Sequence, residues 1–84
     1  MRIATWNVNS LRVRLELALD WLREKGPEVV CLQETKVTDD LFPCEPLREA
    51  GYEVAFSGQK TYNGVAILSR HPMRDVRRKL FQTC

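Results

Sequence analysis

A carboxylate follows an apolar run in the middle of this 84-residue chain. Val29–Leu32 is apolar throughout, and Gln33, Glu34 and Lys36 then supply a carboxamide, a carboxylate and an ammonium. In open α/β sheets, ligands bind at the carboxyl ends of the strands. A buried strand that ends here would hold Glu34 at the rim of a cleft. A surface Glu34 paired with Lys36 explains the same residues without any ligand.

The elements around this run predict a strand–helix–strand unit. Residues 2–8 alternate in polarity as a strand and end in polar residues at Asn7. The apolar run at 29–32 suits a strand covered on both faces, as in a parallel sheet. A crossover of this length makes the two strands parallel, so their ends lie on the same side of the sheet. We therefore expect Asn7 and Glu34 to emerge at one rim.

A helix is expected between these strands, over residues 11–25. Its apolar residues repeat at helical spacing and form one stripe. Ser10 or Asn9 can cap its first turn by accepting from a free backbone N–H. Gly26 supplies a left-handed residue after the helix, and Pro27 prevents its continuation.

The second half of the chain predicts further strands. The expected elements are a polar connector over 37–46, a helical turn over 47–50, a strand over 52–56, a loop over 57–63 and a strand over 64–69. His71 is expected in the turn after the last strand, and Gly64 would allow a close backbone approach or an unusual φ. The tail after Met73 has no clear partner within the chain.

Composition limits the class of protein. The chain is 44% hydrophobic and 29% charged, which is ordinary for a soluble globular protein, and its net charge is +2. Five basic residues lie near the C-terminal end, where a solvated face competes with a phosphate-binding role: Arg70, Arg74, Arg77, Arg78 and Lys79. No stretch approaches a membrane span and no signal peptide is evident, so we expect a cytoplasmic protein with no membrane partner.

The three cysteines are expected to be reduced. Cys31, Cys44 and Cys84 are odd in number and lack the spacing of a metal site. Cys31 is expected as a small buried strand residue. Reduced thiols are the default for a cytoplasmic protein.

Three ordered motifs resemble a known family. TWNVNSLR (residues 5–12), LQETK (32–36) and YNGVAILSR (62–70) resemble the opening of the exodeoxyribonuclease III and apurinic/apyrimidinic endonuclease family, within the endonuclease/exonuclease/phosphatase superfamily. The resemblance covers nearly the whole chain. Two departures are Glu28, where the family usually has Asp, and the sequence from residue 78 onward.

The resemblance implies a fold, an activity and partners. The expected fold is the N-terminal portion of a two-sheet α/β sandwich, beginning with a βαβ unit, and residues 1–84 would be an incomplete domain. The expected activity is Mg²⁺-dependent hydrolysis of DNA phosphodiesters (Mn²⁺ being a possible substitute), with 3′→5′ exonuclease and abasic-site endonuclease action in DNA repair. The partner would be double-stranded DNA with abasic sites or 3′ ends, bound by a monomer.

By the same resemblance, Glu34 and Asn7 are the catalytic and metal-site residues. Mg²⁺ takes one or two carboxylates and keeps several waters, which suits Glu34 at a strand end. Asn7 would help to hold the metal or the scissile phosphate through its amide. Without the resemblance, Asn7 is simply a good turn former.

Five residues resemble the family's DNA-contacting or metal-neighbouring positions: Asn9, Arg12, Lys36, Tyr62 and Asn63. Such contacts fix the register of a nucleic acid without reading its sequence. A helix cap competes with this role for Asn9, and an i,i+4 pair with Glu16 competes for Arg12. Trp6 and Trp21 are expected in the core rather than stacked on bases.

Other interpretations remain open. The substrate could instead be RNA, an inositol phosphate or a sphingolipid head group, or the chain could be a non-catalytic nucleic-acid-binding unit. The family's enzymes are about three times longer, and their tyrosine, Asp-x-Asn pair and late Asp and His have no match here. We therefore expect an N-terminal fragment, inactive alone, with an apolar sheet face partly bare.

Overall fold

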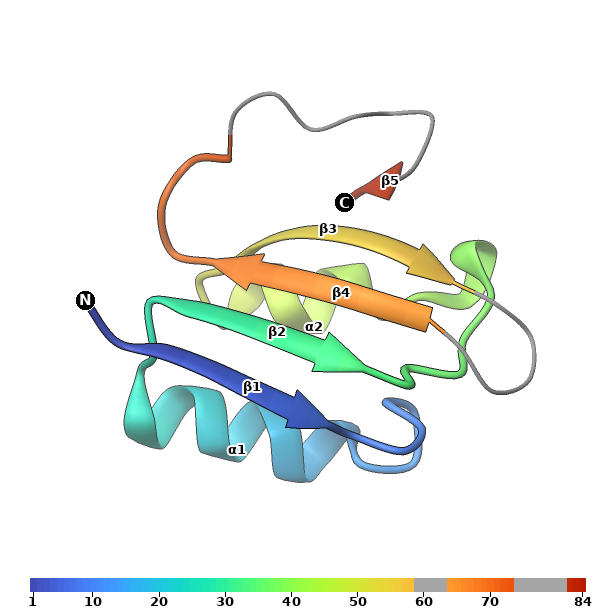
Figure 1. Cartoon of the computed structure of the whole chain (residues 1–84), viewed down its shortest axis with the longest axis horizontal. Coiled ribbons are helices and arrows are strands. Elements are labelled where there is room, and N and C mark those ends of the chain that lie inside the picture. Colours follow the sequence, from blue (N-terminus) through green and yellow to red (C-terminus); the bar gives the residue numbers. More distant parts are fainter. Residues whose placement is uncertain (59–63, 74–81) are drawn as a thin grey trace.

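A parallel βαβ unit opens the fold, as the sequence predicts (Figure 1). The computed structural model describes residues 1–58, 64–73 and 82–84. Strand β1 (Ile3–Asn7) and strand β2 (Val29–Gln33) pair in parallel, with Asn7 opposite Gln33. Helix α1 (Leu15–Lys25) crosses between them. Gly26 is left-handed (φ 56°) and donates its N–H to the Leu22 carbonyl, so the predicted helix stop is confirmed.

Helix α1 begins four residues later than predicted. Asn9 and Ser10 have positive φ values of 46° and 85°, and the residues 11–14 form turns. Arg14 is the residue before the helix, and no side chain caps it. The predicted cap by Ser10 or Asn9 is therefore wrong. The i,i+4 helical pair considered for Arg12 and Glu16 is not formed, because Arg12 lies in the turns before α1.

The second half completes one five-stranded mixed sheet. Its elements are the short 3-10 helix η1 (Asp39–Leu41), helix α2 (Cys44–Glu49) and strands β3 (Glu53–Gly58), β4 (Gly64–Ser69) and β5 (Gln82–Thr83). The strand order is β1-β2-β4-β3-β5, and β4 runs antiparallel to both β2 and β3. The sheet is therefore mixed rather than wholly parallel. Helix α2 starts earlier than predicted because Pro46 falls in its first turn, where proline is tolerated.

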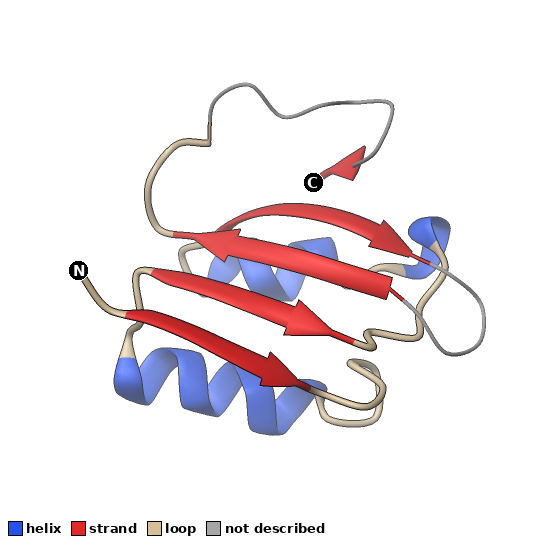
Figure 2. Ribbon diagram, in the orientation of Figure 1, coloured by secondary structure: helices blue, strands red, loops and turns tan. Residues whose placement is uncertain are grey.

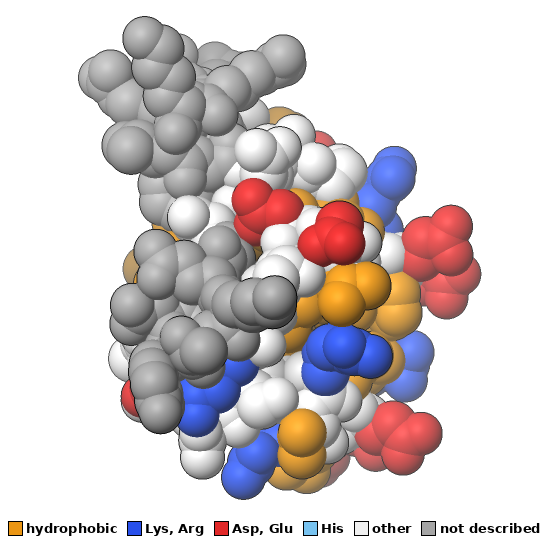
Figure 3. Space-filling model, turned by 90° about the vertical axis from the view of Figure 1, so that its right-hand side faces the viewer, with side chains coloured by type: hydrophobic (Ala, Val, Ile, Leu, Met, Phe, Trp, Pro, Cys, Tyr) orange, Lys and Arg blue, Asp and Glu red, His pale blue; other side chains and the backbone are white. Residues whose placement is uncertain are grey.

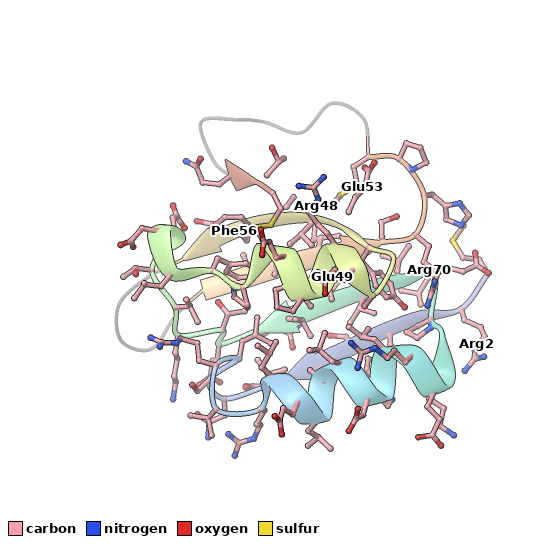
Figure 4. All side chains as sticks on the ribbon, turned by 180° about the vertical axis from the view of Figure 1, so that it is seen from behind. Arg2, Arg48, Glu49, Glu53, Phe56 and Arg70 are labelled. Carbon is pink, nitrogen blue, oxygen red and sulfur yellow. A yellow bond between two sulfur atoms is a disulfide. The ribbon has the colours of Figure 1, made fainter. Side chains whose placement is uncertain are left out.

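Both α-helices cover the same face of the sheet (Figures 2 and 4). The core lies between that face and the helices, and its fully buried side chains include Leu22 of α1, Val30 of β2, Leu47 of α2 and Leu68 of β4. The connector expected to be polar also contributes, since Phe42 stacks on Phe56 with ring centroids 4.1 Å apart.

Among the described residues, no helix covers the opposite face of the sheet. The strand register places Thr5, Cys31 and Ile67 in one row across that face. Ile3 is 68% exposed and Val65 is 42% exposed. The prediction of a partly bare apolar face is confirmed, whereas the prediction that β2 is covered on both faces is wrong. Cys31 is half-buried on that face rather than buried.

Cys44 and Cys84 form a disulfide, so the prediction that all thiols are reduced is wrong for this pair. The Cα atoms lie 5.4 Å apart because β5 pairs with β3 and brings the chain end over α2. Cys84 also donates its N–H to the Val54 carbonyl. The end of the chain therefore has a partner, contrary to prediction. The tail's apolar and basic residues between 74 and 81 lie outside the described residues.

No helix in the described part of the chain is long and apolar enough to cross a membrane.

His71 lies in the turn after β4, as predicted, and is joined to Glu28. The Ser69 hydroxyl accepts from the His71 N–H at 3.0 Å. His71 Nε2 lies 3.1 Å from a Glu28 carboxylate oxygen. Tyr52 closes the same end of the sheet by donating its hydroxyl to the Pro27 carbonyl at 2.6 Å, and the Arg70 guanidinium (labelled in Figure 4) lies over its ring.

The Glu28–His71 contact predicts an acid-sensitive contribution to stability. The hydrogen bond from His71 holds the pKa of Glu28 below its ordinary value of 4.5. A carboxyl with a depressed folded-state pKa stabilises the fold above its unfolded-state pKa and loses this effect as the pH falls through the folded value. We expect Glu28→Gln to lower the unfolding free energy near neutral pH, and the deficit to shrink below pH 4.5. Urea denaturation of both proteins across this range measures it. A deficit that stays constant or grows on acidification would contradict the assignment.

Candidate functional site

Asn7 and Glu34 meet at one end of the sheet, where the arrows of β1 and β2 end together in Figure 1. The Asn7 side-chain nitrogen donates a hydrogen bond to a Glu34 carboxylate oxygen. The Asn7 side-chain oxygen accepts from the Asn9 backbone N–H at 3.1 Å. The geometric prediction from the parallel crossover is confirmed: two neighbouring strands bring an amide and a carboxylate together.

The two contacts of Asn7 define the orientation of its amide. A carboxylate can only accept and a backbone N–H can only donate, so the nitrogen must face Glu34 and the oxygen must face Asn9. In this arrangement Asn7 holds the Glu34 carboxylate in place. Its oxygen is engaged within the protein.

Lys36 and Asn9 form the second half of the same cluster. The Lys36 ammonium donates to the Asn9 side-chain oxygen and lies 4.0 Å from the other Glu34 carboxylate oxygen. The pairing of Glu34 with Lys36 considered from the sequence is thus present, in addition to the contact with Asn7. Asn9 anchors Lys36 instead of capping a helix. The Glu34 side chain remains 41% exposed, so its carboxylate is accessible to a ligand.

Backbone hydrogen bonds join the two loops that carry these residues. Val8 donates to the Gln33 carbonyl, Ser10 to Glu34 and Leu11 to Thr35, at 2.9–3.0 Å. A helix leaves its first N–H groups without intrahelical partners, so these bonds do not compete with α1; the late start instead follows from the positive φ values of Asn9 and Ser10, which are not helical. Glu34 and Lys36 adopt left-handed φ values of 52° and 53°, as Asn9 and Ser10 do. These two joined loops, residues 8–11 and 33–36, form the rim of the sheet, and we call them the double loop.

Gly64 at the start of β4 packs closely against the double loop. It has a φ of 117°, and its carbonyl accepts from the Thr35 N–H at 3.1 Å. A Cβ at position 64 would lie 2.3 Å from the Thr35 hydroxyl oxygen. Both expectations for Gly64, a close approach and an unusual φ, are confirmed.

The predicted DNA-contacting residues are only partly described. Arg12 is exposed in the turn before α1, next to the rim. Tyr62 and Asn63 lie outside the described residues. Two residues at the rim were not predicted from the sequence: Arg14, which donates to the Asn9 carbonyl at 2.8 Å, and Thr35, which is fully buried there. The glycine at the start of β4 was the available signal for Thr35, because glycine in a strand often marks a close approach.

Trp6 and Trp21 belong to the packing rather than to the rim. Their rings meet edge to face with centroids 5.7 Å apart, and both pack against the core. With Thr5 and Leu17 they line an open hollow of about 330 Å³ beside β1. The tryptophans were expected in the core, and the structure places them partly buried against it.

The donor set at the rim fits a weakly held Mg²⁺. Mg²⁺ is typically bound through one or two carboxylates and retains several waters, and Glu34 supplies one accessible carboxylate whose orientation Asn7 fixes. Among the described residues no three acidic, histidine or cysteine side chains come close enough to form a metal centre. Figure 3 looks onto this end of the molecule and shows acidic, basic and apolar side chains interspersed over its described surface.

A family model and several similar proteins place this chain in the same protein family. The model of the Endonuclease/Exonuclease/phosphatase family matches residues 4–83. The chain is similar to exodeoxyribonuclease III of Haemophilus influenzae, 37% identical over 78 residues, which covers 93% of this chain and 29% of that protein. It is also similar to the DNA repair nuclease APEX1 of Danio rerio, 35% identical over 83% of this chain and 24% of the relative. The chain thus spans less than a third of the length of the curated relatives it matches.

Solved structures that resemble this chain in fold come from the same kind of enzyme. An AP endonuclease from Archaeoglobus fulgidus superposes with a TM-score of 0.88 at 48% identity, over 92% of this chain and 30% of that one. The 3′ phosphatase NExo (D146N) from Neisseria, bound to a product DNA hairpin, superposes with a TM-score of 0.86 at 49% identity, over 89% and 29% of the two chains. The mixed α/β sheet of this chain therefore matches the corresponding part of the fold of these enzymes, less than a third of their length.

Proposed function

Because this chain belongs to the endonuclease/exonuclease/phosphatase family, we propose that its rim is one side of the active site of a DNA repair nuclease. The reaction would be Mg²⁺-dependent hydrolysis of DNA phosphodiesters at abasic sites and 3′ ends. The similar proteins named above are an exodeoxyribonuclease III, a DNA repair nuclease, an AP endonuclease and a 3′ phosphatase bound to a product DNA hairpin. The observation that carries the proposal is the Asn7–Glu34 contact at the shared end of β1 and β2.

Glu34 would hold the metal and Asn7 would orient Glu34. A bound Mg²⁺ would supply charge neutralisation for a phosphate ester and activation of a water. A carboxylate that is already fixed by a hydrogen bond loses less side-chain entropy when a cation binds. Asn7 provides that hydrogen bond, so its main role here is to position Glu34.

Lys36 would contact the DNA backbone. Its ammonium is tethered by Asn9 and lies beside Glu34, so a metal bound to Glu34 would leave Lys36 held at the rim. A fixed ammonium next to a metal attracts a phosphate without reading its sequence. Arg12, exposed in the neighbouring turn, is the second candidate for a phosphate contact.

Metal binding by Glu34 is directly testable. We expect Mn²⁺, used as a paramagnetic probe, to broaden the NMR resonances of Asn7 and Glu34 selectively. Glu34→Gln should weaken Mn²⁺ binding by more than about tenfold, because loss of a metal-orienting group alone costs that much. Glu49→Gln on α2, an exposed carboxylate away from the rim, is the matched control. Equal Mn²⁺ affinity of Glu34→Gln and Glu49→Gln would refute the metal role.

DNA binding by the same chain is measured by fluorescence anisotropy with an abasic duplex at several salt concentrations. Lys36→Ala should weaken binding and lower the salt dependence by about one phosphate contact. We expect no strand cleavage by the 84-residue chain, because among its described residues no three acidic, histidine or cysteine side chains come together as a metal centre. Cleavage of the duplex that Glu34→Gln abolishes would contradict this expectation.

A further inference from the structure

Glu34 has an unfavourable backbone conformation that something must hold in place. Its φ of 52° is left-handed, and Lys36 two residues later has a φ of 53°. Non-glycine residues in this region are strained and persist only where the surroundings determine the conformation. In this conformation the Glu34 carboxylate accepts a hydrogen bond from the Asn7 side chain.

Thr35, between these two residues, is fully buried and fixed on both sides. Its carbonyl accepts from Leu11 at 2.9 Å, and its N–H donates to the Gly64 carbonyl at 3.1 Å. The Thr35 side chain occupies the space that a Cβ at position 64 would need. That Cβ would lie 2.3 Å from the Thr35 hydroxyl oxygen and 3.3 Å from the Lys36 backbone nitrogen. The contact therefore exists only because residue 64 is glycine.

We propose that Thr35 and Gly64 are positioning residues, which hold the left-handed turn at Glu34 and so aim its carboxylate at Asn7. We call the packing of Thr35 against Gly64 the lock. Its importance for chemistry rests on the function proposed above. Its geometry belongs to the chain itself and can be measured without metal or DNA.

The lock depends on the shape of Thr35 rather than on its hydroxyl. Within the described residues, the Thr35 hydroxyl oxygen is buried without a hydrogen-bond partner. Replacing a buried, unpaired polar atom by an apolar group of the same shape is nearly neutral or stabilising. Thr35→Val should therefore keep the lock, whereas Thr35→Ala removes the packed group and should loosen it.

Gly51 offers a matched control for Gly64. It also has a positive φ, of 96°, but it lies at the other end of β3, where a Cβ would meet only the end of the Arg70 side chain at 3.1 Å. Gly51→Ala and Gly64→Ala both force alanine into a strained conformation, so both should lower stability. Only Gly64→Ala should disturb the rim.

Two NMR signatures report on the lock. A left-handed Glu34 gives a strong NOE between its own amide and α protons, and the contact with Asn7 gives NOEs between the Asn7 side-chain amide and the Glu34 side chain. We expect both signatures in the parent chain, in Thr35→Val and in Gly51→Ala. We expect Gly64→Ala and Thr35→Ala to lose most of both.

These spectra distinguish a specific effect of Thr35 and Gly64 on the rim from a general loss of stability. Gly64→Ala spectra with both signatures intact would overturn the proposal, and so would equal losses in Gly51→Ala, since a general loss of stability would then be the cause. If Gly64→Ala does not fold, the comparison of Thr35→Ala with Thr35→Val decides, and equal behaviour of these two overturns the lock. A parent chain that binds no Mn²⁺ would refute the proposed metal role, while these spectra would still test the lock.

Discussion

Leu68→Ala is expected to lose about 3–5 kcal/mol of unfolding free energy, which is a large part of the stability of a small domain. Leu68 is 0% exposed. It lies in β4, between Val30 of β2 and Val54 of β3. Because neighbours from two strands surround it, the site cannot collapse easily, and a cavity adds to the lost burial.

Urea denaturation followed by circular dichroism measures this loss. Val65→Ala is the matched control, because Val65 lies in the same strand on the open face and is 42% exposed. It should cost no more than about 1 kcal/mol, the span of β-propensity in a host protein. Similar losses in both variants would mean that the core does not lie on the helical side of β4.

Reduction of the Cys44–Cys84 disulfide should lower the unfolding free energy by about 2–4 kcal/mol. The bond joins cysteines 40 residues apart in sequence, so it restricts a long loop of the unfolded chain. In the native state it holds β5, whose register with β3 is only Ala55 with Thr83 and Phe56 with Gln82. We expect reduction to release β5 and leave the edge of β3 open.

Denaturation with and without dithiothreitol tests this prediction. Cys84→Ser should show the low stability under both conditions, whereas Cys31→Ala should keep the full response to the reductant, because Cys31 is not part of the bond. A parent chain with equal stability in both conditions would contradict the assigned role of the disulfide.

Local patterns were sufficient to predict the elements that build the rim. The period of the apolar residues distinguishes the first two strands from the helix, and Gly26 followed by Pro27 ends the helix as expected. The meeting of Asn7 and Glu34 then follows from the parallel crossover alone. This part of the site could be predicted because each step uses contacts between neighbouring elements.

The features that the sequence did not predict depend on contacts between distant segments. Asn9 and Ser10 are typical helix caps, yet the N–H groups of Ser10 and Leu11 bind carbonyls of the second loop instead. The disulfide and β5 require the register of β3 with the chain end. Thr35 is packed only once the fold brings Gly64 of β4 against it. Short-range periodicity contains no information on these pairings.

The hydrogen bonds between residues 8–11 and 33–35 have a consequence for how such a site can evolve. They join main-chain atoms only, so these bonds do not depend on which side chains occupy the exposed positions of the rim, whereas the buried Thr35 and Gly64 remain required. Substitutions at the exposed positions could therefore change what the rim binds while these backbone bonds are kept. Under the function proposed above, accommodating a different phosphate ester would then require few changes elsewhere in the protein.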